Sequence, residues 1–294
     1  MKQVKKLSGI GSSQKVYKSL KNRISKLKGN NIIPTLAVIL VGNDLASSVY
    51  VRAKQKMFDQ MKLKTETFKL RGNTTESLLL KLLAKLNNDI NFHGILIQLP
   101  LPKHINANKI LYSVDPKKDV DGFHPENMGL LSVGKPRFIP CTPKGIMRIF
   151  EYEKISLIGK HVVVIGRSNI VGRPISILTS LKNKHSNATT TLCHSGSRNI
   201  KQFIKQADIL IVAIGKPNYI NGGMLKSGVV IIDVGINKSK IDNGKNYKLF
   251  GDVDWESIKG IAHAATPVPG GVGPMTIAML LENTVDAAEH IYKF

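Results

Sequence analysis

The stretch VVVIGRSNIVGRP, residues 162–174, places a continuous apolar run directly before a glycine-containing turn and a helix-like segment. Such a run is typical of a strand buried on both faces of a parallel sheet. Gly166 permits a tight turn, and the backbone N–H groups at the start of the next helix favour a phosphate group. Because Ser168 stands where G-x-G-x-x-G has its middle glycine, a plain strand–helix turn is the alternative interpretation.

Strand-like and helix-like segments alternate on both sides of this stretch. This alternation predicts an α/β fold with parallel sheets covered by helices. Residues 115–143 interrupt it with prolines, glycines and charges, as a functional loop or a domain junction does. The strand-like segments are TLAVILV (35–41), TETFKL (65–70), HGILIQL (93–99), HVVVIG (161–166), ATTTLCH (188–194), DILIVAIG (208–215) and VVIIDVG (229–235).

We therefore expect two lobes with a cleft between them. The N-terminal α/β catalytic lobe would span residues 1–139 and be joined by a C-terminal helix at 274–294. Residues 140–273 would form a Rossmann-like dinucleotide-binding lobe. In such open sheets ligands bind beyond the carboxyl ends of the strands, which directs attention to the residues that follow each apolar run.

Composition narrows the classes of function. The chain of 294 residues carries a formal net charge of +23, but its lysines are spread along the sequence and only 6% of residues are aromatic. We expect a solvated lysine-rich surface and no specific nucleic-acid partner. No apolar run reaches membrane-spanning length, no secretory leader is recognisable, and the histidines lack metal-ligand spacing. The two cysteines, Cys141 and Cys193, fit a reducing, cytoplasmic location.

A possible catalytic group gathers around the first apolar run. Tyr50 and Lys54 are four residues apart and would share one face of the helix that follows it. Gln98 ends the strand-like run at 93–99, and Asp121 lies in the long loop that follows. Partial burial could bring the lysine pKa to roughly 7–8, where an amine exchanges protons at neutral pH. Alone, the Tyr–Lys pair would be an ordinary surface pair; its convergence with Gln98 and Asp121 favours a site.

An absence bears on the choice of dinucleotide. NAD-binding folds usually place a carboxylate at the end of the second strand, yet no acidic residue occurs between Glu153 and Asp208. This segment instead offers basic and hydroxyl side chains that suit the 2′-phosphate of NADP. The alternative is that Arg167 only braces the pyrophosphate or points to solvent. These side chains are Arg167, His194, Ser195 and Arg198.

Several motifs occurring in order give the chain a resemblance to a known family. After about residue 30 the whole sequence resembles the bifunctional methylenetetrahydrofolate dehydrogenase/methenyltetrahydrofolate cyclohydrolase family. The stretch LSGIGSSQK (7–15) departs from the family's usual Asp-Gly-Lys, and AHAA (262–265) lacks an aromatic residue common there. The motifs are YVRAKQK (50–56), GILIQLPLP (94–102), DPKKDVDGFHPENMG (115–129), PCTPKG (140–145), GRSNIVGRP (166–174), DVGIN (233–237) and TPVPGGVGPMT (266–276).

The resemblance implies a role for each candidate residue. Lys54 would be the catalytic lysine, Gln98 the glutamine that tunes it, and Asp121 the acid that holds the pterin amino edge. Tyr50 would stack near the folate. The loop at 266–276, which could otherwise be only a rigid connection, would wall the folate pocket with Pro269, Gly270 and Gly271. The cofactor would contact Gly166, Arg167, Ser168, His194, Ser195, Gly215 and Ile236.

The resemblance also implies an activity. The protein would oxidise 5,10-methylenetetrahydrofolate to the 5,10-methenyl form with NADP⁺ and hydrolyse that product to 10-formyltetrahydrofolate, as a homodimer. One alternative is a dehydrogenase with weak or absent cyclohydrolase activity. The other is a basic nucleic-acid-binding protein, which would need a clustered basic face.

Overall fold

A computed structural model describes residues 3–241 and 246–291 of the chain. These residues form two compact units. The first contains Met1–Gln14 and Thr142–Thr276, and the second contains Lys15–Cys141 and Ile277–Phe294. The mixed α/β class predicted from the sequence is confirmed, with parallel sheets in both units.

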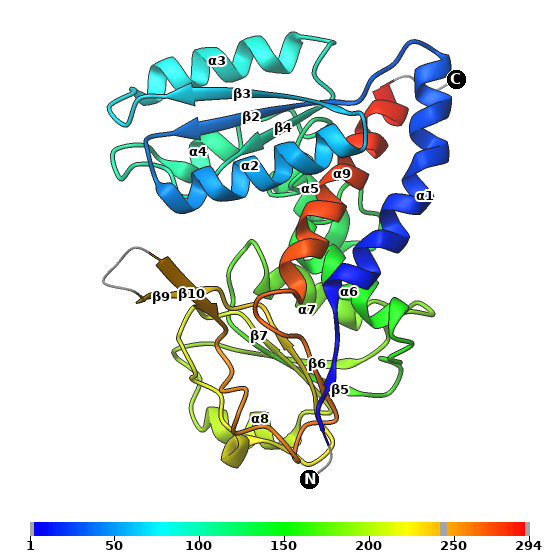
Figure 1. The fold of residues 1–294 in the computed structure, drawn as a ribbon, viewed down its shortest axis with the longest axis vertical. Helices are drawn as coiled ribbons and strands as arrows, with labels where there is room; N and C mark the ends of the chain where they lie inside the picture. Colours follow the sequence, from blue (N-terminus) through cyan, green and yellow to red (C-terminus); the bar gives the residue numbers. More distant parts are fainter. Residues whose placement is uncertain (1–2, 242–245, 292–294) are drawn as a thin grey trace. The chain divides into compact units, whose positions relative to one another are not determined.

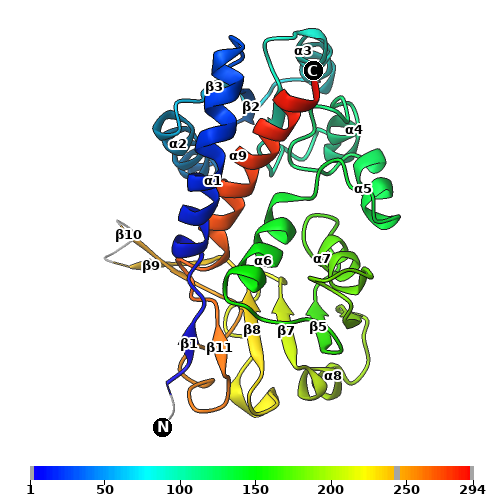
Figure 2. The ribbon, with the colours of Figure 1, turned by 90° about the vertical axis from the view of Figure 1, so that its right-hand side faces the viewer.

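The second unit is built on a three-stranded parallel sheet in the order β3-β2-β4. The central strand β2, Thr35–Val41, is apolar on both faces because helices cover both. Figures 1 and 2 show α2 on one face and α3 on the other. The outer strands are β3, Lys64–Leu70, and β4, Gly94–Ile97; the helices are α2, Leu45–Gln60, and α3, Glu76–Asn88.

One face of this sheet carries the core of the unit. Ala37, Ile39 and Val41 alternate along β2 and pack in one cluster with apolar side chains of α3, such as Leu79 and Leu83. This is the period of two that a strand imposes. The remaining helices of the unit are α4, Ala107–Leu111, and α5, Pro125–Ser132, together with most of α1, Gly9–Gly29, and of α9, Val272–Ile291.

The start of α3 differs from the sequence-based expectation. NTTE at 73–76 resembles a capping box with Asn73 as the cap, but the cap is Thr75, whose hydroxyl accepts a hydrogen bond from the Leu78 N–H at 3.3 Å. The Glu76 carboxylate instead binds the Asn106 N–H at 2.9 Å, which ties α3 to the start of α4. The pairing of a capping box between Asn73 and Glu76 is therefore absent from this turn.

The end of α3 is closed by a lysine from the loop that leads to Asp121. The Lys118 ammonium is buried and donates to the carbonyls of Leu86 and Asp89 at 3.0 and 2.7 Å. Lys118→Met keeps most of the stem but leaves both carbonyls without this donor, so we expect a loss of about 1–3 kcal/mol in unfolding free energy. Urea unfolding measures it, with the exposed Lys117→Met as control; equal stabilities would contradict the capping role.

The first unit contains a six-stranded parallel sheet in the order β1-β11-β8-β7-β5-β6. Figure 2 shows β1, β11, β8, β7 and β5 side by side. The chain moves from β5 to β6 on one side and then to β7 on the other, which makes a switch point at the carboxyl ends of β5 and β7. The strands are β1, Lys5–Lys6; β5, His161–Ile165; β6, Thr189–Cys193; β7, Ile209–Val212; β8, Val230–Asp233; and β11, Ala264–Ala265.

Two features of this unit have no counterpart in the sequence-based prediction. The N-terminal strand β1 pairs with β11, Lys5 opposite Ala264, so residues 3–14 group with this unit although the sequence placed them in the first lobe. An antiparallel hairpin of β9, Asn237–Ile241, and β10, Asn246–Phe250, follows β8. The helices of the unit are α6, Cys141–Tyr152, α7, Gly172–Ser180, α8, Ile200–Gln206, and the 3₁₀ helix Gly222–Met224.

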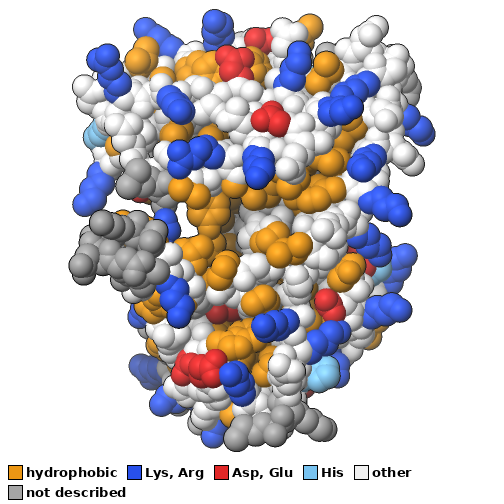
Figure 3. Space-filling model, viewed as in Figure 1, with side chains coloured by type: hydrophobic (Ala, Val, Ile, Leu, Met, Phe, Trp, Pro, Cys, Tyr) orange, Lys and Arg blue, Asp and Glu red, His pale blue; other side chains and the backbone are white. Residues whose placement is uncertain are grey.

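Basic side chains are scattered over the face of the molecule drawn in Figure 3, with acidic and apolar side chains between them. None of the helices within residues 3–241 and 246–291 combines the length and the hydropathy of a membrane-spanning helix.

Candidate active site and cofactor loops

Helix α2 presents Tyr50 and Lys54 after the carboxyl end of β2. The helix begins there because the Asp44 carboxylate caps it, accepting the Ser47 N–H at 2.7 Å. Tyr50 and Lys54 leave α2 one turn apart on the same face. Both side chains are half-buried. Burial raises the pKa of the Tyr50 phenol, which keeps it protonated at neutral pH.

Lys54 is held by a side chain from the neighbouring strand. Its ammonium donates to Gln98 Oε1 at 3.0 Å, and Gln98 Nε2 donates to the Leu99 carbonyl at 2.8 Å. The second bond fixes the amide so that its oxygen faces the lysine. Gln98 reaches this position because β4 pairs with β2 and ends beside it. The structure therefore brings Lys54 and Gln98 together.

The electrostatics at Lys54 favour proton exchange. Burial lowers the pKa of Lys54, while the negative charge at Asp121, and to a smaller extent at Cys141, opposes this shift. Burial also raises the pKa of Asp121, opposed chiefly by Lys54 and then by a hydrogen bond with Cys141. Each group thus stabilises the other's charge.

The loop before Asp121 is itself braced by buried polar groups. Asp119 Oδ2 accepts the His124 N–H and the Asn127 side-chain N–H, both at 2.8 Å. Gly122 has a φ of +74°, and an added Cβ would lie 2.9 Å from the Pro140 nitrogen. The tight turn sequence DVDG is therefore set by Asp119 and Gly122.

Asn283 of α9 also supports this loop, and sequence analysis did not single it out. Its fully buried side-chain amide donates to the carbonyls of Val120 and Ile139 at 2.7 and 3.1 Å and lies 3.7 Å from Cys141 Sγ. A buried asparagine on an otherwise apolar helix face was the available signal. It holds the backbone on the N-terminal side of Asp121.

In the other unit, the turn after β5 lies against the end of β7. Gly166 has a φ of +115°, and an added Cβ would lie 2.3 Å from the Ala213 carbonyl oxygen. At Gly172, the first residue of α7, an added Cβ would lie only 1.9 Å from the Gly166 carbonyl oxygen. Both glycines are therefore required by close backbone packing, as in a phosphate-binding turn.

Ser168 and Arg167 have different surroundings in this turn. The Ser168 hydroxyl accepts the N–H of Val171, the residue before α7, at 3.1 Å. The exposed Arg167 guanidinium lies 3.3 Å from His194 Nε2, at the end of β6. Ser195 follows and is exposed. Arg167, His194 and Ser195 therefore form a basic and hydroxyl-bearing edge at the carboxyl ends of β5 and β6.

The other predicted residues of this unit lie in three loops. Gly215 follows β7 with a φ of +63°, and Ile236 follows β8 and is exposed. Pro269, Gly270 and Gly271 lie before α9, where the Gly270 carbonyl accepts the Gly9 N–H at 3.0 Å. These last three residues belong to a different unit from Lys54.

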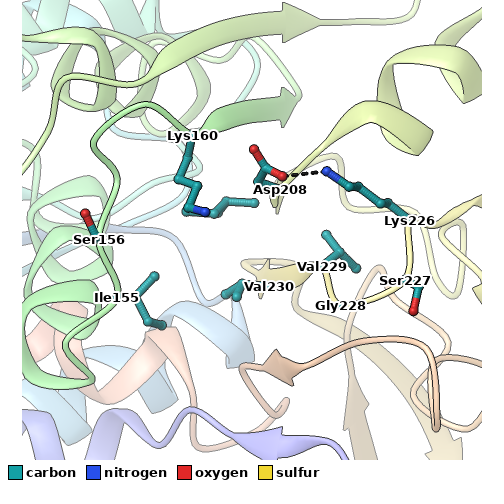
Figure 4. A pocket seen from close by; sticks show the side chains of 10 residues that line it. Ile155, Ser156, Lys160, Asp208, Lys226, Ser227, Gly228, Val229 and Val230 are labelled. Atoms are coloured by element: carbon teal, nitrogen blue, oxygen red, sulfur yellow. Dashed lines mark hydrogen bonds and ion pairs between the residues drawn. The ribbon is translucent and has the colours of Figure 1, made fainter.

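A cavity of about 140 Å³ lies at the opposite edge of the same sheet, beside the amino ends of β5, β7 and β8. Figure 4 shows Lys160, Asp208 and Lys226 around it, with Lys226 paired to Asp208 at 2.6 Å. Ligands of open parallel sheets bind at the carboxyl edge, so this cavity is not the cofactor site. Within the described parts of the chain, no group of three His, Cys, Asp or Glu side chains could hold a metal ion.

Comparison with known proteins identifies the family. The model for the "Tetrahydrofolate dehydrogenase/cyclohydrolase, catalytic domain" matches residues 7–121, and that for the "NAD(P)-binding domain" of the same family matches residues 140–292. The chain is 50% identical over 287 residues to the Bifunctional protein FolD of Acetivibrio thermocellus, covering 98% of each chain. It is 49% identical over 283 residues to the one of Halalkalibacterium halodurans, covering 96% of this chain and 98% of that one.

Comparison with solved structures supports the same family. The bifunctional enzyme FolD of Campylobacter jejuni superposes with a TM-score of 0.91 at 44% identity, covering 98% of this chain and 99% of that one. The methylenetetrahydrofolate dehydrogenase-cyclohydrolase of Trypanosoma brucei, complexed with NADP and an inhibitor, gives 0.93 at 32% identity over the full length of both chains. The resemblance seen in the motifs is confirmed: the chain belongs to the tetrahydrofolate dehydrogenase/cyclohydrolase family.

Proposed function

We propose that the protein oxidises 5,10-methylenetetrahydrofolate to 5,10-methenyltetrahydrofolate with NADP⁺ and then hydrolyses this product to 10-formyltetrahydrofolate. The single observation that carries the proposal is the bond between Lys54 and Gln98, with Asp121 near the same amine. Relatives at about half identity over the whole chain are named as bifunctional, which supports both steps.

We assign folate binding and catalysis to the unit that contains Lys54. The Asp121 carboxylate can accept bonds from the ring N–H and the amino group of a pterin, because both are donors. Tyr50, protonated and half-buried, offers a ring face for stacking. The backbone of Pro269, Gly270 and Gly271 is assigned to the wall of the folate pocket.

The turn after β5 fits a dinucleotide. Gly166 and Gly172 bring strand and helix backbones together, and Arg167, His194 and Ser195 offer positive charge and a hydroxyl without a competing carboxylate. We assign these residues, with Ser168, Gly215 and Ile236, to the cofactor. When bound, NADP⁺ supplies the hydride acceptor for the methylene carbon of the folate. The protein's part in that step is alignment, because the adjacent nitrogen lone pairs stabilise the cation that forms.

The hydrolysis step moves protons, and here Lys54 acts. Water adds to the methenyl carbon, and the neutral amine takes the proton that the water loses. The resulting carbinolamine then loses its hydroxyl proton to solvent as the carbon–nitrogen bond to N5 breaks, N5 receives the proton held by the Lys54 ammonium, and the formyl group stays on N10, with one proton released overall. Gln98 Oε1 orients the amine by accepting one of its N–H groups. This arrangement favours a bifunctional enzyme over a dehydrogenase with weak cyclohydrolase activity.

One assay tests both steps. Purified protein is given 5,10-methylenetetrahydrofolate with NADP⁺ or NAD⁺, and the absorbances of reduced nicotinamide and of the methenyl product are followed. We expect reduced cofactor with little accumulated methenyl product. Stable accumulation of the methenyl form would favour the dehydrogenase-only alternative, and absence of reduced cofactor would reject the proposal.

Arg167→Ala tests the cofactor assignment. We expect the KM for NADP⁺ to rise about 10- to 100-fold, because charge-assisted bonds to the 2′-phosphate are worth about 1.5–3 kcal/mol. The KM for NAD⁺ should change little, since NAD⁺ lacks that phosphate. Steady-state kinetics with both cofactors measure this, with the exposed Lys182→Ala as control. An equal rise in the KM values for NADP⁺ and NAD⁺ would assign Arg167 to the pyrophosphate instead.

We further propose a homodimer and a cytoplasmic location. The family resemblance supports the first. The two cysteines, which are buried and form no disulfide, support a reducing compartment. Light scattering of the purified protein tests the dimer, and a monomer at micromolar concentration would reject it.

A further inference from the structure

Two buried carboxylates connect the loops at the carboxyl edge of the six-stranded sheet. Asp233 ends β8 and is 4% exposed, and Asp252 follows β10 and is fully buried. We call this pair the aspartate clasp. Burying a carboxylate costs free energy unless hydrogen bonds compensate it. The hydrogen-bond partners of the two aspartates therefore show which segments the clasp holds.

Asp252 binds the loop that follows β7. Its Oδ2 accepts the N–H groups of Ile214 and Gly215 at 2.8 and 2.9 Å. Its Oδ1 accepts a side-chain N–H of Asn237 at 2.9 Å, the residue at which the loop after β8 passes into β9. One carboxylate therefore holds the loops that follow two different strands.

Asp233 binds the segment that carries Asp252. Its two oxygens accept the N–H groups of Gly235, Asp252 and Val253 at 2.9, 3.0 and 3.0 Å. Burial raises its pKa to about 6, and the nearby Asp252 carboxylate adds to this while the three N–H donors oppose it. The clasp is thus a chain of contacts from β8 through residues 252–253 to the loop after β7.

Two glycines, Gly235 and Gly251, pack directly against the carboxylates of the clasp. A Cβ at Gly251 would lie 1.8 Å from Asp233 Oδ2, and one at Gly235 would lie 2.3 Å from Asp252 Oδ1. The backbone therefore approaches each carboxylate as closely as it can. Neither position can therefore carry a side chain while the carboxylate keeps its place.

We infer that Asp252 is a positioning residue for the dinucleotide, which acts by holding the Gly215 loop and the Ile236 loop in their binding conformations. This rests on the proposed function, which assigns both loops to the cofactor. Asp252 accepts the Gly215 N–H itself. It also binds Asn237, and Asp233 binds Gly235, so the two neighbours of Ile236 are both held by the clasp.

The test separates cofactor binding from folate chemistry. We measure the dissociation constant of NADP⁺ by calorimetry, and the hydrolysis of 5,10-methenyltetrahydrofolate without any cofactor. Asp252→Ala leaves two loop N–H groups without an acceptor, so we expect binding weakened about 10- to 100-fold. The hydrolysis rate should stay within about two-fold of the wild type, because that step needs no dinucleotide.

Asp252→Asn and Asp208→Ala complete the design. The asparagine keeps one acceptor oxygen but turns an N–H₂ group toward Asn237, so we expect weakening of only a few-fold. Asp208 lies at the amino edge of the same sheet and also binds a backbone N–H, that of His161 at 2.9 Å. Asp208→Ala should leave the dissociation constant unchanged.

Three results would overturn the inference. They are unchanged NADP⁺ binding in Asp252→Ala, equal weakening in Asp208→Ala, or a hydrolysis rate that falls in parallel with binding. If Asp252→Ala does not fold by circular dichroism, Asp252→Asn decides, and unchanged binding in it overturns the inference. Wild-type protein that binds NADP⁺ without turnover rejects the proposed function alone, whereas one that binds no dinucleotide rejects both.

Discussion

Lys54→Met should lower the rate of methenyltetrahydrofolate hydrolysis by about 10²–10⁴-fold, the usual contribution of a positioned acid–base group. Methionine keeps most of the length of the lysine stem, so the packing of α2 should survive. The amine that donates to Gln98 is lost, and with it the group that takes the proton from water. Stopped-flow or steady-state decay of the methenyl absorbance measures the rate.

Lys56→Met is the matched control, because Lys56 is exposed on the same helix. It should hydrolyse the methenyl substrate at the wild-type rate. Hydride transfer in Lys54→Met should fall much less than hydrolysis, since alignment of the rings does not need the amine. Unchanged hydrolysis in Lys54→Met would remove Lys54 from the mechanism.

The pH dependence follows from the direction of the pKa shift. Burial lowers the pKa of Lys54, although the Asp121 carboxylate opposes this. The neutral amine is the base, so hydrolysis should rise with pH through this lowered pKa and then level off. Because the folded pKa lies below the unfolded one, the lysine binds protons more tightly in the unfolded chain. Its contribution to stability therefore increases with pH between the two values.

Asp121→Ala should weaken folate binding and impair both activities. Two charge-assisted bonds to the pterin edge are at stake, each worth about 1.5–3 kcal/mol. The KM for methylenetetrahydrofolate should therefore rise by about 10²-fold or more, while the dissociation constant of NADP⁺ stays near the wild-type value. Kinetics with varied folate and calorimetry with the cofactor measure the two effects.

Asp115→Ala is the control for this prediction. Asp115 lies in the same loop, and its carboxylate accepts the Lys117 N–H at 2.8 Å. The substitution should lower stability slightly and leave kinetics per folded molecule unchanged. If Asp121→Ala gave the same result as Asp115→Ala, Asp121 would be a turn-forming residue and the pterin assignment would fail.

Local sequence patterns determined the strands and most helices of this protein. The apolar runs at 35–41 and 161–166 contain β2 and β5, because a strand buried on both faces must be apolar at successive positions. Parallel strands then bring their carboxyl ends to one edge, so Lys54 and Gln98 could be expected to meet without knowledge of the helix packing.

Only the tertiary structure decided how the loops at those edges are held. Asn283 reaches Val120 across more than 160 residues of sequence, and the Asp252 carboxylate reaches the loop of Ile214 and Gly215 across nearly 40. Nothing in the local pattern around these residues encodes such partners. The pairing of β1 with β11 is of the same kind. Short-range propensity and periodicity fix the elements, whereas the acceptors for buried polar groups depend on which distant segments the packed core brings together.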